Sequence, residues 1–213
     1  MLTQQQVAEH NIPREVLRPI LPSPRYLPTD EIEADDQGNP IIEEPLFLLS
    51  CSLAEDVVRA KYPSLWRYLE SGVKEGISSR YLSAHRSPWY AQENRPPSPF
   101  LCTYMGRSGA ERENPFRFIL NHSQATAANV YLMLYPKPVL ANALRQSPGL
   151  ARCVWEALRG ISPKSLVISG RVYGGGLHKM EPKELANSSA DNLLAACGDI
   201  LREKEAVPTL FDQ

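Results

Sequence analysis

Residues 100–135 read FLCTYMGRSGAERENPFRFILNHSQATAANVYLMLY, and three runs of aromatic and branched side chains in this stretch decide the fold. The runs are residues 100–106, 116–121 and 129–135. Residues of these types favour β-strands because they pack well on a pleated, half-buried surface. We therefore predict three strands in this part of the chain.

Further patterns lie on both sides of these strands. Residues 46–51 predict a buried strand, and a helical pattern then runs from Ser52, a suitable N-cap, to Gly72, with an interruption at Pro63. Residues 138–145 and 149–160 predict helices, residues 166–172 a strand, Pro182 the start of a short helix, and residues 190–204 a last amphipathic helix. Because strand–helix–strand units are few, we expect an α+β fold, with a mixed or antiparallel sheet and several peripheral helices.

Composition divides the chain into three parts. Residues 1–45 hold seven prolines and many acidic residues, which predicts an extended lead-in segment with a turn at residues 34–40. Residues 46–187 are expected to form one domain, and residues 188–213 a C-terminal helix and tail.

The four cysteines lie far apart without a Cys-x-x-Cys pair, which argues against a disulfide scaffold or a zinc knuckle. No apolar run reaches the roughly 20 residues of a membrane helix, and the first ten residues lack the pattern of a signal peptide. We therefore expect a cytoplasmic protein with no membrane partner.

Charge is segregated along the chain although the net charge is only −1. Residues 1–79 carry 7 Lys/Arg against 13 Asp/Glu, residues 80–183 carry 14 against 5, and residues 184–213 carry 2 against 6. A cationic middle segment between acidic flanks points to an anionic polymer as partner, and arginines scattered over a solvated surface are the alternative.

The sequence offers little for catalysis. The four histidines have no second histidine, cysteine or carboxylate at metal-ligand spacing, so no metal site is expected. A Gly-x-Ser-x-Gly elbow is absent, and His122 is interpreted as a hydrogen-bonding loop residue rather than a general base.

Three consecutive glycines, Gly174, Gly175 and Gly176, could be mistaken for a nucleotide loop. No Gly-Lys-Ser/Thr follows them, and they come late in the chain with no strand after them, which excludes the Walker and dinucleotide patterns. The glycines therefore predict a turn with positive φ or a close approach of the backbone to another group. That group is either the domain itself or a nucleic-acid backbone.

Other polar residues of the middle segment suit duplex DNA. The loop at residues 121–129 carries Asn121, Ser123, Gln124 and Asn129, which could contact phosphates or base edges or could satisfy their own turn. Trp89 could stack on a base or sugar, or it could pack within the protein.

Three stretches carry a family resemblance: residues 80–107 (RYLSAHRSPWYAQENRPPSPFLCTYMGR), 115–138 (PFRFILNHSQATAANVYLMLYPKP) and 170–187 (GRVYGGGLHKMEPKELAN). Together they resemble the carboxy-terminal part of adenine-specific DNA methyltransferases of bacterial type II restriction–modification systems, of the XhoI type and more loosely the TaqI-like type. The resemblance implies a target-recognition domain. In the family, a separate amino-terminal domain binds S-adenosylmethionine and methylates the amine of a flipped adenine.

This chain lacks the family's catalytic motifs. Asn114-Pro115-Phe116 has no second proline, and Asn39-Pro40-Ile41 reads as a turn, so neither matches the Asn-Pro-Pro-Tyr/Phe clamp. We therefore expect that this chain alone binds no cofactor and is inactive. It would recognise DNA as a separate polypeptide, or would serve mainly to dock onto a separately encoded catalytic methyltransferase chain.

The chemistry of the side chains divides the candidate DNA contacts. Arg86, Arg107, Arg117, Gln124 and Asn129 are expected to read base edges, and Arg95, Arg171, Lys179 and Lys183 to meet phosphates. The remaining candidates are Trp89, Asn121, Ser123, Gly174, Gly175, Gly176 and His178.

Overall fold

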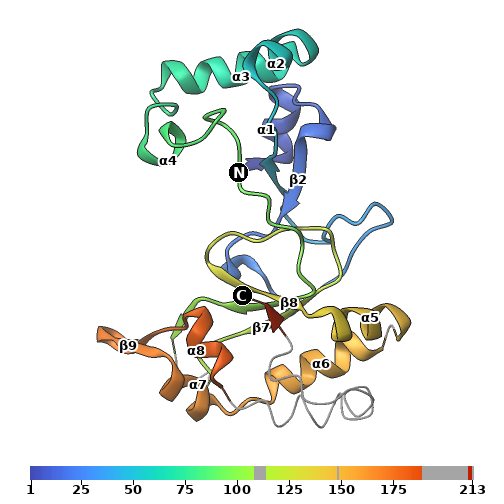
Figure 1. The fold of residues 1–213 in the computed structure, drawn as a ribbon, viewed down its shortest axis with the longest axis vertical. Coiled ribbons are helices and arrows are strands. Elements are labelled where there is room, and N and C mark those ends of the chain that lie inside the picture. The colour runs from blue at the N-terminus through green and yellow to red at the C-terminus, as the bar shows by residue number, and fades with distance from the viewer. Residues whose placement is uncertain (108–113, 148, 189–210, 213) are drawn as a thin grey trace.

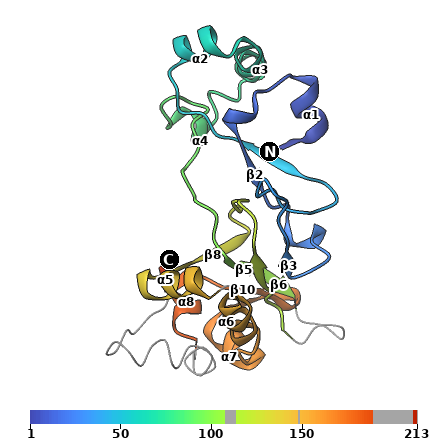
Figure 2. The same cartoon turned by 90° about the vertical axis from the view of Figure 1, so that its right-hand side faces the viewer.

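The computed structural model describes residues 1–107, 114–147, 149–188 and 211–212. These residues form two lobes, which Figures 1 and 2 show one above the other. We call residues 1–20 and 46–90 the N-terminal lobe and residues 21–45, 97–107, 114–147, 149–188 and 211–212 the main lobe. The fold class is α+β as predicted, with small sheets and several helices around them.

A five-stranded sheet forms the centre of the main lobe, in the order β11-β8-β5-β7-β3. The strands β5, β7 and β8 correspond to the three runs of the opening stretch, and all their pairings with one another are antiparallel, whereas β3 pairs with β7 in parallel. The bounds are β3 Glu31–Ile32, β5 Phe100–Thr103, β7 Phe118–Asn121, β8 Tyr131–Pro136 and β11 Phe211–Asp212.

Both faces of this sheet are covered, which explains why β5 and β7 are buried along their whole length. Phe100 and Leu120 lie on one face in the core that includes α5 and α6, and Leu101 and Ile119 lie on the other face against Leu21 and neighbouring residues. A strand that is buried on both faces reads as a continuous apolar run.

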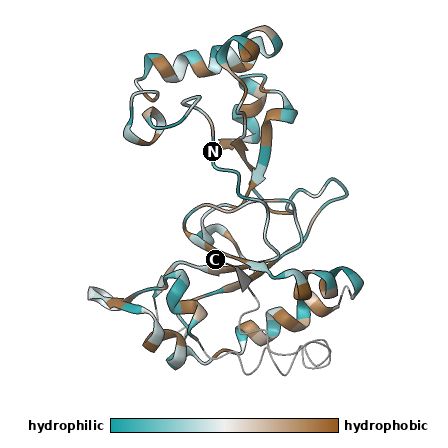
Figure 3. Cartoon of the chain, in the orientation of Figure 1, coloured by the Kyte–Doolittle hydropathy of each residue, from teal (hydrophilic) through white to brown (hydrophobic). Residues whose placement is uncertain are grey.

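Helices of the main lobe are α5 Pro138–Gln146, α6 Leu150–Arg159, α7 Pro163–Ser169 and α8 Pro182–Ala186. Trp155 of α6 fixes the helix to the sheet by donating a 2.8 Å hydrogen bond to the carbonyl of Phe118. In Figure 3, hydrophobic and hydrophilic residues alternate along α6 and α3, as expected of helices that bury one face. The predictions for residues 138–145, 149–160 and Pro182 are confirmed.

The predicted strand at residues 166–172 is wrong for its first half. Pro163 occupies the first turn of α7, and Gly170 follows the last residue of this helix. Leu166 lies in the helix and its side chain is fully buried, and only Arg171–Tyr173 form a strand, β9. A short apolar run does not distinguish a strand from a buried helix, and the proline before it carried the decisive information.

The N-terminal lobe combines an antiparallel sheet, β1-β4-β2, with four helices. Its core includes Val58, Leu65 and Leu69 from two of the helices. The bounds are β1 Leu2–Thr3, α1 Gln4–Glu9, β2 Leu17–Ile20, β4 Leu46–Leu49, α2 Glu55–Lys61, α3 Pro63–Lys74 and α4 Tyr81–Ala84, with 3-10 turns η1 Arg14–Val16 and, in the main lobe, η2 Pro24–Tyr26.

Two expectations about the helices of this lobe are wrong. Ala54 rather than Ser52 precedes α2, and α3 continues through Gly72 to Lys74. Gly72 lies inside the helix and close to Trp89: an added Cβ would stand 3.1 Å from the Trp89 ring. Its role is therefore close packing and not termination.

Residues 1–45 contribute to both lobes: β2 pairs with β4 in the N-terminal lobe, and β3 pairs with β7 in the main lobe. The predicted turn at residues 34–40 is present, with hydrogen bonds from the backbone amides of Gln37 and Asn39 to the Asp35 carboxylate. The division of the chain at residues 45 and 187 stays a prediction, and the predicted helix at residues 190–204 lies outside the described residues.

Candidate nucleic-acid interface

A small antiparallel sheet, β6-β10-β9, lies at one end of the main lobe and carries the glycine turn (Figure 1). Its strands are β6 Met105–Arg107, β9 Arg171–Tyr173 and β10 Leu177–Lys179. Residues 100–106 were expected as one strand, but Tyr104 separates β5 from β6. The backbone of Tyr104 bonds to Val130 on one side and to Met180 on the other, so the chain leaves the central sheet here and enters the small one.

One face of the small sheet is basic and apolar at once. Directly opposed residues of an antiparallel pair point to the same side, and Leu177 is opposite both Arg107 and Tyr173, whereas Lys179 is opposite both Met105 and Arg171. We call this set the outer face, and its residues are partly or largely exposed. Its members are Met105, Arg107, Arg171, Tyr173, Leu177 and Lys179.

The opposite face anchors the sheet. His178 is buried and its ring lies edge-on to Phe116, 6.5 Å between centroids. Gly106 packs so tightly that an added Cβ would meet the carbonyl oxygen of Pro115. The predicted DNA contact His178 is therefore part of the core, and the anchoring directs the cationic side chains of the other face to solvent.

Carboxylates balance part of the charge on the outer face. Arg171 pairs with Glu184 at 2.8 Å, and Lys179 pairs with Glu181 at 2.6 Å and lies over the Tyr104 ring. Arg171 and Lys179 each donate a hydrogen bond to the partner carboxylate, which raises the pKa of both cations, so both stay charged. Because an exposed ion pair contributes only about 0–1 kcal/mol, a phosphate can recruit Arg171 at little cost.

The glycine turn joins β9 to β10 at the end of the hairpin. Gly175 and Gly176 have φ angles of 72° and 70°, which confirms the predicted positive-φ turn. An added Cβ would meet nothing within 4 Å at Gly174, Gly175 or Gly176. The turn therefore does not need glycine for packing within the described chain, and its backbone is open to an approaching partner.

Lys183, in α8, is exposed and lies one residue from the Glu184 that pairs with Arg171. The structure thus brings together seven of the predicted site residues on or beside the outer face. They are Arg107, Arg171, Gly174, Gly175, Gly176, Lys179 and Lys183.

Arg117 is used inside the chain. Its guanidinium pairs with Asp30 at 2.6 Å and donates to the carbonyls of Pro24, Leu27 and Thr29, and only 11% of the side chain is exposed. The arginine, which directly precedes β7, thereby holds residues 24–30, the segment before β3, in place. Base readout, which was predicted for Arg117, would require that these bonds break.

Asn121 and Ser123 likewise serve the fold. Asn121 donates to the carbonyls of Ser98 and Ala125, and its oxygen accepts from the amide and hydroxyl of Ser123. Both side chains are buried, so the polar loop satisfies its own turn, which was one of the two alternatives. Gln124 and Asn129 in the same loop are exposed, but they lie outside the small sheet.

The remaining candidates lie apart from the outer face. Trp89 packs edge-on to Tyr90 in the core of the N-terminal lobe, and Arg86 bonds to Gln92 close by. Arg95 pairs with Glu93 on the connection between the lobes. The structure therefore favours packing over stacking for Trp89.

Tyr173 and Met105 were not among the predicted contacts, although each is 45% exposed on the outer face. The alternation of Arg171-Val172-Tyr173 was the available signal: if Arg171 faces solvent from a strand, Tyr173 does too. The predicted strand at residues 166–172 ends before Tyr173, so the prediction did not extend to this side chain.

Neither candidate for the adenine clamp fits that role. The Asn114 side chain accepts a 3.0 Å hydrogen bond from the amide of Phe116, whose ring is buried in the core. Asn39 is bonded to Asp35 within a turn. Both asparagine side chains are therefore engaged in local hydrogen bonds.

None of the helices in the described part of the chain is long and apolar enough to cross a membrane.

Comparison with known proteins identifies relatives among type II methyltransferases. Type II methyltransferase M.XamI of Xanthomonas campestris pv. amaranthicola is 31% identical over 131 residues, which cover 62% of this chain and 22% of that protein. Type II methyltransferase M.AccI of Acinetobacter calcoaceticus is 30% identical over 118 residues, 55% of this chain and 20% of that protein. The matched parts thus span about a fifth of the length of these relatives, and no solved structure matches.

The family described as the C-terminal domain of type II methyltransferase M.Eco57I matches residues 1–205, nearly the whole chain. The chain belongs to this family of type II methyltransferase C-terminal domains, as the resemblance in its sequence predicted.

Proposed function

We propose that this domain binds duplex DNA through the outer face of the small sheet and serves as the target-recognition part of an adenine-specific type II methyltransferase. The observation that carries the proposal is the alignment of Arg107, Arg171 and Lys179 on one exposed face, beside an open glycine turn. Such a face offers cations to phosphates and a planar arginine fork to guanine edges.

The positions of the cations support a division of roles between them. Arg171 and Lys183 lie at the outer edge of the small sheet and on α8, where they can meet the backbone of the duplex. Arg107 lies on β6 opposite Leu177, on the other side of β10 from Tyr173, and it is the candidate for base contact. A three-stranded sheet with protruding side chains can follow a groove in the way that β-ribbon readers do.

Methyl transfer requires a catalytic domain outside these 213 residues, on the same polypeptide or another. S-adenosylmethionine and the adenine would bind there, since the clamp candidates of this chain are occupied in the fold. Here the residues of this chain would orient the DNA and perform no step of the reaction.

Fluorescence anisotropy with a labelled duplex at two salt concentrations tests the proposal. We expect binding that weakens steeply as salt rises, because cations that meet phosphates release counterions. Absence of binding, or binding that does not respond to salt, would contradict it.

Docking onto a catalytic domain is a second candidate function. Tyr81 and Leu82, in the one-turn helix α4, are 77% and 68% exposed, and Val73 at the end of α3 is 48% exposed. Large apolar side chains exposed at a surface, as in α4, can mark a protein interface. Co-purification with a methyltransferase catalytic domain, lost in a Leu82→Ser variant that still binds DNA, would support this role.

A further inference from the structure

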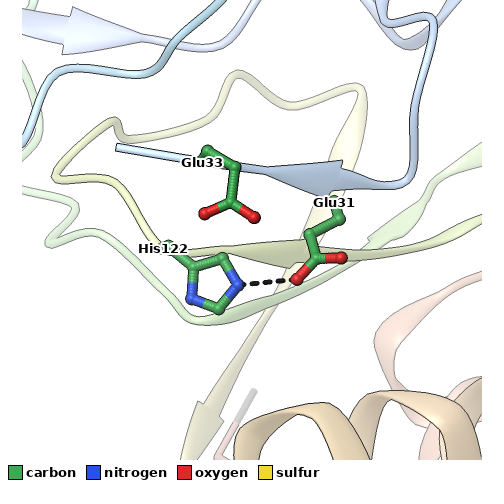
Figure 4. A group of neighbouring side chains, drawn as sticks. All are labelled: Glu31, Glu33 and His122. Atoms are coloured by element: carbon green, nitrogen blue, oxygen red, sulfur yellow. Dashed lines mark hydrogen bonds and ion pairs between the residues drawn. The ribbon is translucent and has the colours of Figure 1, made fainter. Parts of the chain in front are cut away.

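Two glutamates and a histidine from distant parts of the chain meet at the edge of the central sheet (Figure 4). Glu31 and Glu33 flank Ile32 on and after β3, and His122 follows Asn121 at the end of β7. Because Ile32 and Asn121 are buried and paired across the two strands, alternation turns their neighbours outward on the same side. The ligand atoms of the three side chains all lie within 4.8 Å of one another.

We propose that Glu31, Glu33 and His122 bind a divalent transition-metal ion of the zinc class, which ties the edge strand β3 to the loop after β7. No local sequence pattern predicts this site, because residues 31–33 and 122 are far apart along the chain. The proposal does not depend on DNA binding, since none of the three residues belongs to the small sheet.

The distances suit such an ion after small adjustments. Metal bonds of roughly 2.1 Å in tetrahedral geometry place ligand atoms about 3.4 Å apart. His122 Nε2 already stands 3.0 Å from Glu31 Oε1. Glu33 and His122 are exposed, so torsions at their side chains can close the remaining separation without moving the sheet.

The donor set selects the class of ion. An imidazole nitrogen with carboxylate oxygens favours zinc, nickel or cobalt, whereas magnesium and calcium prefer oxygen ligands alone. Three protein ligands leave the remaining coordination positions to water.

Arg152 competes for one of the ligands. Its Nη2 contacts Glu31 Oε1 at 2.5 Å from helix α6, and His122 contacts the same oxygen. His122 and Arg152 both contact Oε1 of Glu31 rather than Oε2, and within the described residues Glu33 makes no ion pair. Binding of the metal ion therefore competes with the partly exposed ion pair between Arg152 and Glu31, and removal of Arg152 should strengthen the binding of the metal ion.

Cobalt titration of the full chain after chelator treatment, followed by visible absorption and by calorimetry, tests the site. We expect His122→Gln and Glu33→Gln each to weaken binding by at least about tenfold, since even the loss of an outer partner of a metal site costs 10–100-fold. Arg152→Gln should bind more tightly than the parent chain. His85→Gln, at an exposed histidine of the N-terminal lobe, is the matched control and should leave binding unchanged.

Glu33→Gln guards against a folding artefact, because its exposed side chain has no ion pair to lose within the described residues. Circular dichroism without metal should be the same for this variant and the parent chain. Failure of the parent chain to bind cobalt or zinc overturns the proposal. Equal affinity of the parent chain and both ligand variants overturns it too, since the ion would then be held elsewhere.

Discussion

Replacement of Arg171 by glutamine tests the assignment of the outer face most directly. The side chain is 60% exposed and its pairing with Glu184 is a surface ion pair, so the substitution should leave the free energy of unfolding within about 0.5 kcal/mol of the parent chain. An effect on DNA affinity would then come from the interface and not from the fold.

The size of the effect follows from the number of cations offered to phosphates. Arg171, Lys179 and Lys183 predict a slope of log affinity against log salt of about −2.7, at roughly 0.9 for each phosphate contact. Between 50 and 200 mM salt, affinity should therefore fall about 40-fold for the parent chain and about 12-fold for Arg171→Gln, which has a slope near −1.8.

Anisotropy titrations of one labelled duplex across this salt range measure both slopes. Arg145→Gln is the matched control, because Arg145 is an exposed arginine on α5, which Figure 1 shows at the opposite end of the main lobe from β9. Its slope should equal that of the parent chain. If Arg171→Gln and Arg145→Gln reduce the slope equally, the cations act as a diffuse field and the outer face is not the interface.

Four further outcomes follow from the same geometry. Gly174→Ala should weaken DNA binding without lowering the melting temperature, because nothing lies within 4 Å of the added Cβ; a normal affinity would mean that the turn does not approach DNA. Gly106→Ala should lower both stability and DNA binding, since its Cβ would overlap the carbonyl of Pro115; an unchanged melting temperature would refute this account. Arg117→Gln should lower the free energy of unfolding, measured with urea, by about 3 kcal/mol, because it leaves the partly buried Asp30 carboxylate and three carbonyls without their donor; a decrease below about 1 kcal/mol would contradict the structural role. Burial raises the pKa of Tyr90 to about 12, and its neutral hydroxyl, which donates a hydrogen bond to the carbonyl of Leu53, contributes about 1 kcal/mol below pH 10. As the pH rises from 10 to 12 the tyrosine of the unfolded chain ionises first, so the parent chain should lose this advantage over Tyr90→Phe and end as the less stable of the two; a constant difference would count against this account.

The sequence predicted the elements that local patterns determine. Three strands of the central sheet, β5, β7 and β8, were predicted because they are rich in aromatic and branched residues, and α5 and α6 because their apolar residues recur with helical period. The two-residue strands β3 and β11 were not predicted, since so short a strand carries no pattern of its own. The wrong strand at residues 166–169 also has a local origin: Leu166-Val167-Ile168 is too short a run to reveal its period, and Pro163, at the first turn of α7, is the residue that marks a helix start.

The site was only partly predictable because its chemistry depends on distant partners. Arg117 and Arg171 have the same side chain in the same cationic segment, but Arg117 meets acceptors 87–93 residues away whereas Arg171 remains largely exposed. Nothing local to either residue distinguishes them. In the same way, His122 showed no metal-ligand spacing, since its neighbours Glu31 and Glu33 arrive through the pairing of β3 with β7.

Two glycine environments in the small sheet point to how the outer face could recognise a rigid duplex. Gly106 is a glycine because the sheet packs against the backbone at Pro115, and this contact holds β6 and its neighbours in place. Gly174 lies in the turn between β9 and β10, where an added Cβ would meet nothing within 4 Å. A sheet that is tightly anchored on one face and open at its turn presents its cations with little conformational entropy left to lose on binding. Glycine in β6 is therefore required by packing within the chain, whereas in the turn the positive φ of Gly175 and Gly176 favours glycine and the space around all three glycines is open.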